Sequence, residues 1–142
     1  MGLLQQVLEL ALERNPAISS ARELSRAYES GWAASLHSDI IVPYIHAFGN
    51  EEQKAKWLPG CASGEVVTAL AMTEPGTGSD VAGIATTATR DGDEYVINGR
   101  KWWTSGAMHP DCKIMIVMLQ TDPDGPPHKR QSQILVPRDA EG

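Results

Sequence analysis

Residues 72–80, with the sequence MTEPGTGSD, combine glycines and hydroxyl side chains directly after an apolar run. Glycines let backbone amides approach a ligand closely, and successive amides in such a turn can form a concavity that binds anions. Thr73, Thr77 and Ser79 would add hydroxyl donors. The segment lacks the Gly-Lys-Ser/Thr element of a P-loop and the Gly-x-Gly-x-x-Gly spacing of dinucleotide sites. On composition alone, a plain surface loop explains it better than a ligand-binding loop.

A second candidate is residues 101–107, KWWTSGA, which place two of the four tryptophans of the chain side by side. At the end of a strand, neighbouring side chains point to opposite faces. Trp103 would then share a face with Ser105, where an indole and a hydroxyl could stack on a flat heterocycle and bond to its rim. Trp102 would point the other way, into the sheet domain or into whatever covers it. A core tryptophan at an ordinary strand end is the simpler alternative when this segment is taken alone.

Together the two segments are far more specific. TEPGTGSD followed by INGRKWWTSGA resembles the acyl-CoA dehydrogenase family in both order and spacing. The resemblance extends upstream through LHSDIIVPYIHAFGNEEQKAKWLP and downstream through HKRQSQILVP, so that it covers residues 36–137. The double tryptophan with Ser-Gly-Ala resembles a subgroup of the family that includes enzymes for long or hydroxylated acyl substrates.

The resemblance implies FAD bound non-covalently between a β-domain and a helical bundle. Residues 70–79 would pass along the flavin, and Ser79 would also face the acyl-CoA substrate. Trp103 would face the flavin, and Ser105 would hydrogen-bond near its N5 atom. The cofactor-binding residues that the resemblance implies are Leu70, Met72, Thr73, Gly78, Ser79, Trp103, Thr104 and Ser105.

The reaction implied is α,β-dehydrogenation of an acyl-CoA thioester: a base removes the α-proton while the β-hydrogen leaves as hydride to flavin N5. The family's base is a glutamate of the C-terminal helical bundle, so we expect it beyond residue 142 and expect residues 1–142 by themselves to be inactive. Glu74 resembles the family's structural glutamate and is not predicted to be catalytic. The resemblance also implies electron-transfer flavoprotein as the electron acceptor and a homo-oligomer.

Two alternatives stay open at the level of sequence. One is a non-catalytic module, or decayed fragment, that keeps part of a flavin or CoA surface. The other is an acyl-CoA oxidase-type flavoenzyme on the same fold. The loop and tryptophan motifs do not separate an oxidase from a dehydrogenase, because both enzymes contact the same flavin.

The elements that must position these motifs change in character near residue 65. Residues 1–64 show apolar residues at helical spacing, with Asn15-Pro16 as a helix start. Asn50 and Gln53 have capping-box spacing and predict a short helix that ends before Pro59. A helix over residues 39–48 would begin or kink at Pro43 and end at Gly49.

Strands are predicted after this point, at residues 66–72, 84–89, 95–97, 113–119 and 133–136. Asp91-Gly92 and Asn98-Gly99 predict tight turns, and the polar, Pro-rich residues 122–131 predict a surface loop. We therefore expect an α+β fold: an N-terminal helical region, residues 1–64, followed by part of an antiparallel β-barrel or sandwich domain, residues 65–142. The family's C-terminal helical bundle is missing from these residues.

Composition excludes several classes of partner. The net charge is −6 and the basic residues form no stripe, which argues against nucleic acid. The apolar runs fall well short of the ~20 residues of a membrane span, and no secretory leader is visible. Cys61 and Cys112 lie in different segments and are expected to be reduced. His37 and His46 are expected to be packing or surface residues. We expect a cytoplasmic protein, or a mitochondrial matrix protein in a eukaryote.

Overall fold

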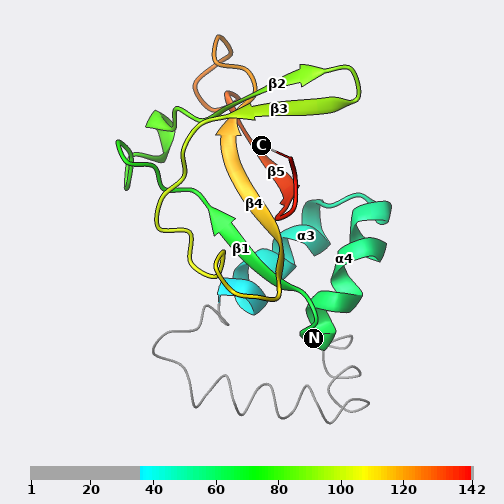
Figure 1. The fold of residues 1–142 in the computed structure, drawn as a ribbon. Coiled ribbons are helices and arrows are strands. Elements are labelled where there is room, and N and C mark those ends of the chain that lie inside the picture. The colour runs from blue at the N-terminus through cyan, green and yellow to red at the C-terminus, as the bar shows by residue number, and fades with distance from the viewer. Residues whose placement is uncertain (1–35, 142) are drawn as a thin grey trace.

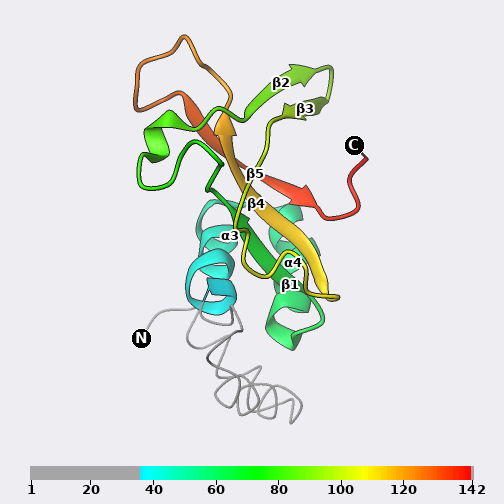
Figure 2. The same ribbon diagram turned by 60° about the vertical axis from the view of Figure 1, so that its left-hand side comes forward.

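The computed structural model describes residues 36–141. The elements in chain order are η1 (Leu36–Ile41), α3 (Val42–Phe48), α4 (Glu51–Ser63), β1 (Val67–Ala71), η2 (Val81–Gly83), β2 (Thr87–Asp91), β3 (Glu94–Asn98), β4 (Cys112–Gln120) and β5 (Gln131–Pro137). Helices α3 and α4 lie at one end of a five-stranded sheet, and a hairpin projects at the other end (Figure 1 and Figure 2). The predicted α+β class, with a partial barrel following helices, is confirmed.

The sheet is mixed, which differs in detail from the antiparallel arrangement expected. The central strand, β4, pairs with β1 in parallel and with β5 in antiparallel register. A parallel pair needs a crossover of a dozen or more residues. Residues 72–111 supply that crossover, since they contain the loop, the β2–β3 hairpin and the double-tryptophan segment. Both candidate motifs therefore belong to the crossover between two neighbouring strands.

The helical region follows the local sequence closely, with one exception. The Asn50 side chain accepts from the Gln53 N–H, and the Gln53 side chain accepts from the Asn50 N–H, which confirms the capping box. Helix α3 has Pro43 in its first turn and ends at Gly49, as predicted. The prediction that the next helix ends before Pro59 is wrong, because α4 continues to Ser63. A proline removes one backbone hydrogen bond from a helix, and the remaining hydrogen bonds and contacts of the helix can offset that loss.

Residues 1–35, including the predicted helix start at Asn15-Pro16, lie outside the described residues. Helix α4 is followed by Gly64, whose φ of 81° places it in the left-handed region that favours glycine.

The two faces of the sheet carry different apolar clusters. Leu70, Ile116 and Leu135 are aligned across β1, β4 and β5. They pack against Ile41 and Ile45 of the helices. We call this cluster, completed by Leu36 and Leu58, the helix–sheet core. The opposite face is built from Ala71, Ala88, Val117 and Leu119, with Ile97, Met115, Ile134 and Val136 around them.

His37 joins the first helical turn to the sheet and to α4. Its Nδ1 accepts from the Thr68 N–H (3.2 Å) and lies 2.7 Å from the Thr68 hydroxyl oxygen, and its Nε2 donates to the Cys61 carbonyl (3.3 Å). Burial lowers the pKa of His37, and the hydrogen bond to Cys61 opposes this effect only in part. The imidazole is therefore neutral, and the expected packing role of His37 is confirmed.

The β2–β3 hairpin turns at Asp91-Gly92, as predicted, and Gly92 has a φ of 60°. The predicted second turn at Asn98-Gly99 is wrong, since β3 ends at Asn98 and the chain continues without a turn. Gly99 serves a different purpose. A Cβ at Gly99 would collide with the backbone and side chain of Thr86, so its missing side chain lets this segment cross closely over the start of β2.

Candidate functional site

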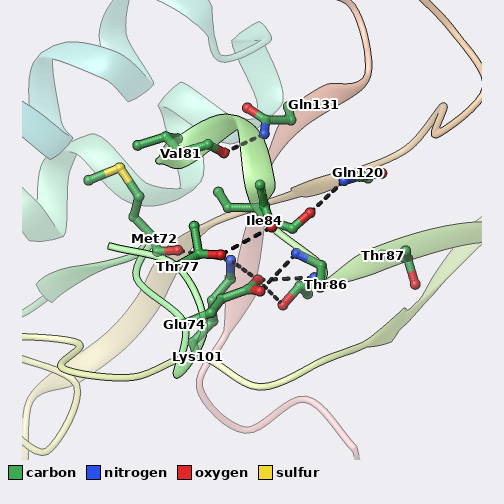
Figure 3. A network of polar contacts seen from close by, with 12 residues as sticks. Met72, Glu74, Thr77, Val81, Ile84, Thr86, Thr87, Lys101, Gln120 and Gln131 are labelled. Carbon is green, nitrogen blue, oxygen red and sulfur yellow. Dashed lines mark hydrogen bonds and ion pairs between the residues drawn. The ribbon is translucent and has the colours of Figure 1, made fainter. Parts of the chain in front are cut away.

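The two candidate motifs lie against each other, although they are separate in sequence. The Trp102 N–H donates to the Thr73 carbonyl (2.8 Å), and the Lys101 Nζ donates to the Met72 carbonyl (3.0 Å). Consecutive residues of one motif thus bind consecutive carbonyls of the other. Figure 3 shows the lysine reaching from its own segment to the loop that carries Met72 and Glu74.

Glu74 stands at the centre of the polar contacts behind this junction. Its carboxylate accepts from the Lys101 Nζ (2.7 Å), the Ala85 N–H (2.8 Å), the Thr86 N–H (3.0 Å) and the Thr86 hydroxyl (Figure 3). Burial acts to raise the pKa of Glu74, but these donors outweigh it and lower the pKa from 4.5 to about 2. The group is a buried anion with its hydrogen-bonding capacity engaged, which suits a structural role and not that of a base.

The outer part of the first motif is a tight, exposed turn. Glu74 and Thr77 exchange backbone hydrogen bonds of 2.9 and 3.1 Å. The Thr77 hydroxyl then donates to the Gly83 carbonyl (3.1 Å), which anchors the turn to η2. Gly78 and Ser79, both predicted to bind ligand, are exposed on this turn. They are open to a ligand, and they lie on a different part of the loop from the junction with Trp102.

The tryptophans do not alternate as predicted. Residues 101–104 form no strand, and the Trp102 and Trp103 rings stack with centroids 5.2 Å apart and planes at 24°. The physical reason lies in Trp103, whose φ of 55° takes the backbone out of the extended conformation that alternation requires. A positive φ is uncommon for a bulky residue and costs about 1–3 kcal/mol. The expectation that Trp102 points the opposite way from Trp103 is wrong, since the two rings stack, and Trp102 is 49% and Trp103 74% exposed.

The hydroxyl residues after the tryptophans lie in a turn. Ser105 is exposed and Thr104 is half-buried, with the Thr104 carbonyl accepting from the Ala107 N–H (3.2 Å). Gly106, with a φ of 85°, allows the chain to reverse here. Ser105 thus follows Trp103 closely, but the strand argument that placed both on one face does not apply.

Leu70 stands apart from the other predicted cofactor residues. Its side chain packs in the helix–sheet core with Ile41, Ile45 and Ile116. A groove of about 450 Å³ also lies away from both motifs, between α3, β5 and the hairpin. Tyr44 and Phe48 line it, and it contains none of the predicted site residues. We therefore place the candidate site at the motif junction and not in this groove.

Sequence reasoning missed the side chains that hold the junction together. The sequence predicts no role for Lys101 or Thr86, although Lys101 lies inside the quoted motif, and it predicts only a turn at Gly99. The pattern Gly-x-Lys-Trp-Trp was visible, but nothing in it shows that the lysine reaches Glu74, because the two residues are brought together only by the crossover.

Comparison with known proteins decides the family. A family model described as the acyl-CoA dehydrogenase middle domain matches residues 69–142, and the acyl-CoA dehydrogenase N-terminal domain matches residues 16–65. The chain belongs to the acyl-CoA dehydrogenase family. It is 54% identical over 143 aligned positions to the probable acyl-CoA dehydrogenase FadE2 of Mycobacterium tuberculosis, covering 94% of this chain and 35% of that relative. The chain thus spans about a third of the length of this curated relative.

Solved structures agree with this assignment to the acyl-CoA dehydrogenases. An acyl-CoA dehydrogenase from Geobacillus kaustophilus superposes with a TM-score of 0.69 at 51% identity, over 73% of this chain and 27% of that one. A glutaryl-CoA dehydrogenase from Mycobacterium smegmatis in complex with FADH2 superposes with a TM-score of 0.63 at 36% identity, over 72% and 25%. The family is one of flavoprotein oxidoreductases of fatty acid metabolism.

Other kinds of site find no support in residues 36–141. Within this range no group of three or more His, Cys, Asp or Glu side chains is placed to hold a metal ion. None of the helices described there has both the length and the apolar character needed to cross a bilayer. Cys61 and Cys112 are buried and unpaired, as predicted, and burial raises the pKa of the Cys61 thiol to about 11.

Proposed function

We propose that this acyl-CoA dehydrogenase family chain forms one wall of an FAD site used for α,β-dehydrogenation of an acyl-CoA thioester. The observation that carries the proposal is the pair of bonds from residues 101 and 102 to the carbonyls of residues 72 and 73. These bonds join the two family motifs and leave an aromatic pair facing outward beside them.

The residues present fit such a cofactor. Trp103 is 74% exposed, so a broad indole surface is available for a flat heterocycle. Within the described part of the chain, the Thr73 and Ser105 hydroxyls make no hydrogen bond, which leaves both able to bond to polar ring atoms. An aromatic surface flanked by uncommitted hydroxyls is the composition of a ligand site with a few orienting polar groups.

Each residue has a distinct task in this proposal. Trp103 stacks against the isoalloxazine, Ser105 donates a hydrogen bond close to N5, and Thr73, with the Met72 backbone, meets the pyrimidine side. Gly78 and Ser79 border the cofactor from the exposed turn, and Ser79 also contacts the CoA arm of the substrate. The chemistry that FAD supplies when bound is acceptance of the β-hydrogen as hydride. The residues of this chain bind, orient and shield the ring.

The catalytic base lies outside residues 36–141 in this proposal. Glu74 is the carboxylate nearest to the motif junction in the contacts described, and its pKa of about 2 makes it a poor proton acceptor. We further propose that residues 1–64 form the N-terminal helical region and residues 65–142 part of the flavin-facing β-domain, with the helix–sheet core joining the two. Homo-oligomer formation, electron-transfer flavoprotein as acceptor, and a cytoplasmic or mitochondrial matrix location complete the proposal.

The test uses the whole polypeptide that the gene encodes. Purified protein should retain FAD, and an acyl-CoA thioester added without oxygen should bleach the visible flavin band in single turnover. Absence of bound flavin after reconstitution would refute the proposal. Fast reoxidation of the reduced protein by oxygen would instead favour the acyl-CoA oxidase alternative, and retained flavin without bleaching by a series of chain lengths would favour a non-catalytic module.

A further inference from the structure

A buried ion pair joins the two motifs of the proposed flavin wall. The Lys101 Nζ and the Glu74 Oε1 are 2.7 Å apart, and their side chains are only 11% and 6% exposed. Removing two charges from water is costly unless further hydrogen bonds satisfy both groups. Those bonds are present here, since the Glu74 carboxylate binds Ala85 and Thr86 and the ammonium group binds the Met72 carbonyl.

The partners of this pair come from three separate segments of the crossover. Met72 and Glu74 belong to the glycine-rich loop, Ala85 and Thr86 lead into β2, and Lys101 begins the double-tryptophan segment (Figure 3). We call these five residues the Glu74–Lys101 network. Every one of its contacts joins residues that are far apart in sequence, so the network fixes how the three segments lie relative to one another.

These contacts fix the position of the double-tryptophan segment along the glycine-rich loop to a single residue. Lys101 binds the carbonyl of Met72, and Trp102 binds the carbonyl of the next residue, Thr73. A slip by one residue would break both bonds and leave the ammonium group buried without its carboxylate. The network therefore determines which loop atoms stand beside the tryptophan pair, while the side chains of its ion pair are themselves only 11% and 6% exposed.

We propose that Glu74 and Lys101 are positioning residues of the flavin site, which set the distance between the loop backbone and the tryptophan pair without touching the cofactor. This inference rests on the proposed function. A lysine suits the task because it has three donors on one compact charge, and two of them are used by the Met72 carbonyl and the Glu74 carboxylate.

The decisive variant is the double substitution Glu74→Gln/Lys101→Met in the whole gene product. It removes both charges together, so that neither is left buried and unpaired, and the glutamine keeps one acceptor oxygen, which can serve either the Ala85 N–H or the Thr86 N–H but not both. The matched control is Glu51→Gln/Lys54→Met, which removes an exposed ion pair of 2.8 Å on α4. Thr86→Val is a milder variant that keeps both charges and removes one hydroxyl donor from Glu74.

The measurements are the FAD dissociation constant and the fine structure of the flavin absorption bands, taken well below the melting temperature of each variant. We expect the double variant to fold and to bind FAD about tenfold more weakly or worse, as for loss of one charge-assisted hydrogen bond. Its flavin bands should shift, Thr86→Val should show a smaller change in the same direction, and the α4 control should show none.

Each outcome has a separate meaning. If the unsubstituted protein binds no FAD, the proposed function fails and this inference fails with it. If the unsubstituted protein binds FAD and the folded double variant binds it equally well with an unchanged spectrum, only the positioning role is overturned. Should the double variant not fold, Thr86→Val decides, because an unchanged dissociation constant and spectrum in that variant would also overturn the proposal.

Discussion

The Glu74–Lys101 network and the helix–sheet core both hold together segments that are distant in sequence, but they do so by different forces. In the helix–sheet core, Ile41 and Ile45 press on Ile116 and Leu70 through apolar contact alone. In the network, each contact is a hydrogen bond with a defined donor, acceptor and direction. Apolar contact gives most of the stabilising free energy in proteins but has little angular preference.

This difference indicates that the two regions have different structural roles. Apolar burial keeps the helices on the sheet, but it does not by itself select one pairing of donor and acceptor. The crossover must instead present particular backbone and side-chain atoms of residues 72–73 and 102–105 to a ligand. Directional, charge-assisted bonds are suited to this because they are lost when a segment shifts by one residue.

The largest expected effect is that of Glu74→Ala, which leaves Lys101 buried without its partner. Breaking a buried pair in this way should lower the free energy of unfolding by about 3–5 kcal/mol. Urea unfolding followed by tryptophan fluorescence measures it. Glu74→Ala/Lys101→Met should recover much of the loss, since no unpaired charge remains. A loss below about 1 kcal/mol in the single variant, the range of exposed pairs, would contradict the assignment of the pair as buried.

Next in size is Ile45→Ala, in the helix–sheet core, where the side chain is 2% exposed. The cavity left behind should cost about 3 kcal/mol, and Ile45→Val should cost about 1 kcal/mol. The same unfolding experiment applies. In contrast to Glu74→Gln/Lys101→Met, Ile45→Val should leave the FAD dissociation constant unchanged below the melting temperature. An equal weakening of FAD binding in both regions would abolish the distinction drawn between them.

Features set by neighbouring residues could be predicted from the sequence. The Asn50 capping box, the Gly49 helix end and the Asp91-Gly92 hairpin each depend on a few adjacent side chains, and all three are confirmed. The helix through Pro59 was missed because the rest of α4 outweighs one lost donor. The parallel pairing of β1 with β4 was missed because pairing depends on the whole crossover and not on either strand.

In the candidate site too, the sequence could not predict features that depend on residues far apart in the chain. The two motifs could be found by resemblance, and the structure brings residues 72–73 and 101–102 together. The orientation of the tryptophans could not be predicted, because the alternation argument assumes an extended backbone and Trp103 has a φ of 55°. The role of Lys101 was equally hidden, since its contacts with Met72 and Glu74 exist only after the crossover has folded.

The two regions should also respond to different ranges of pH. His37, beside the helix–sheet core, has a pKa below 6.5 in the folded state because of burial, so the unfolded chain takes up its proton first. Stability from this group is complete above pH 6.5 and is lost as the pH falls below that value. Glu74 has a folded pKa of about 2 against 4.5, so its contribution is complete above pH 4.5 and is lost between pH 4.5 and about 2.

Urea unfolding at a series of pH values separates the two contributions. His37→Asn should flatten the decline that begins near pH 6.5 and leave the acidic decline in place. Glu74→Gln/Lys101→Met should do the reverse and flatten the decline below pH 4.5. If one substitution flattened both ranges, the two regions would unfold as one titrating unit and the assignment of each range to one residue would be wrong.

The smallest expected change in stability is that of Trp103→Gly, and it isolates the exposed surface from the network behind it. Glycine relieves a left-handed conformation that costs an L-residue about 1–2 kcal/mol, while the lost ring stacking is worth about 0.5–1.5 kcal/mol. The two effects oppose each other, so the free energy of unfolding should change by less than about 1 kcal/mol.

FAD binding by Trp103→Gly should nevertheless weaken about tenfold, because the stacking surface is gone. Trp103→Phe, which keeps an aromatic ring and the strained backbone, should bind FAD nearly as well as the unsubstituted protein. If Trp103→Gly instead bound FAD normally, the loop and its network, and not the tryptophan, would form the whole of the flavin wall.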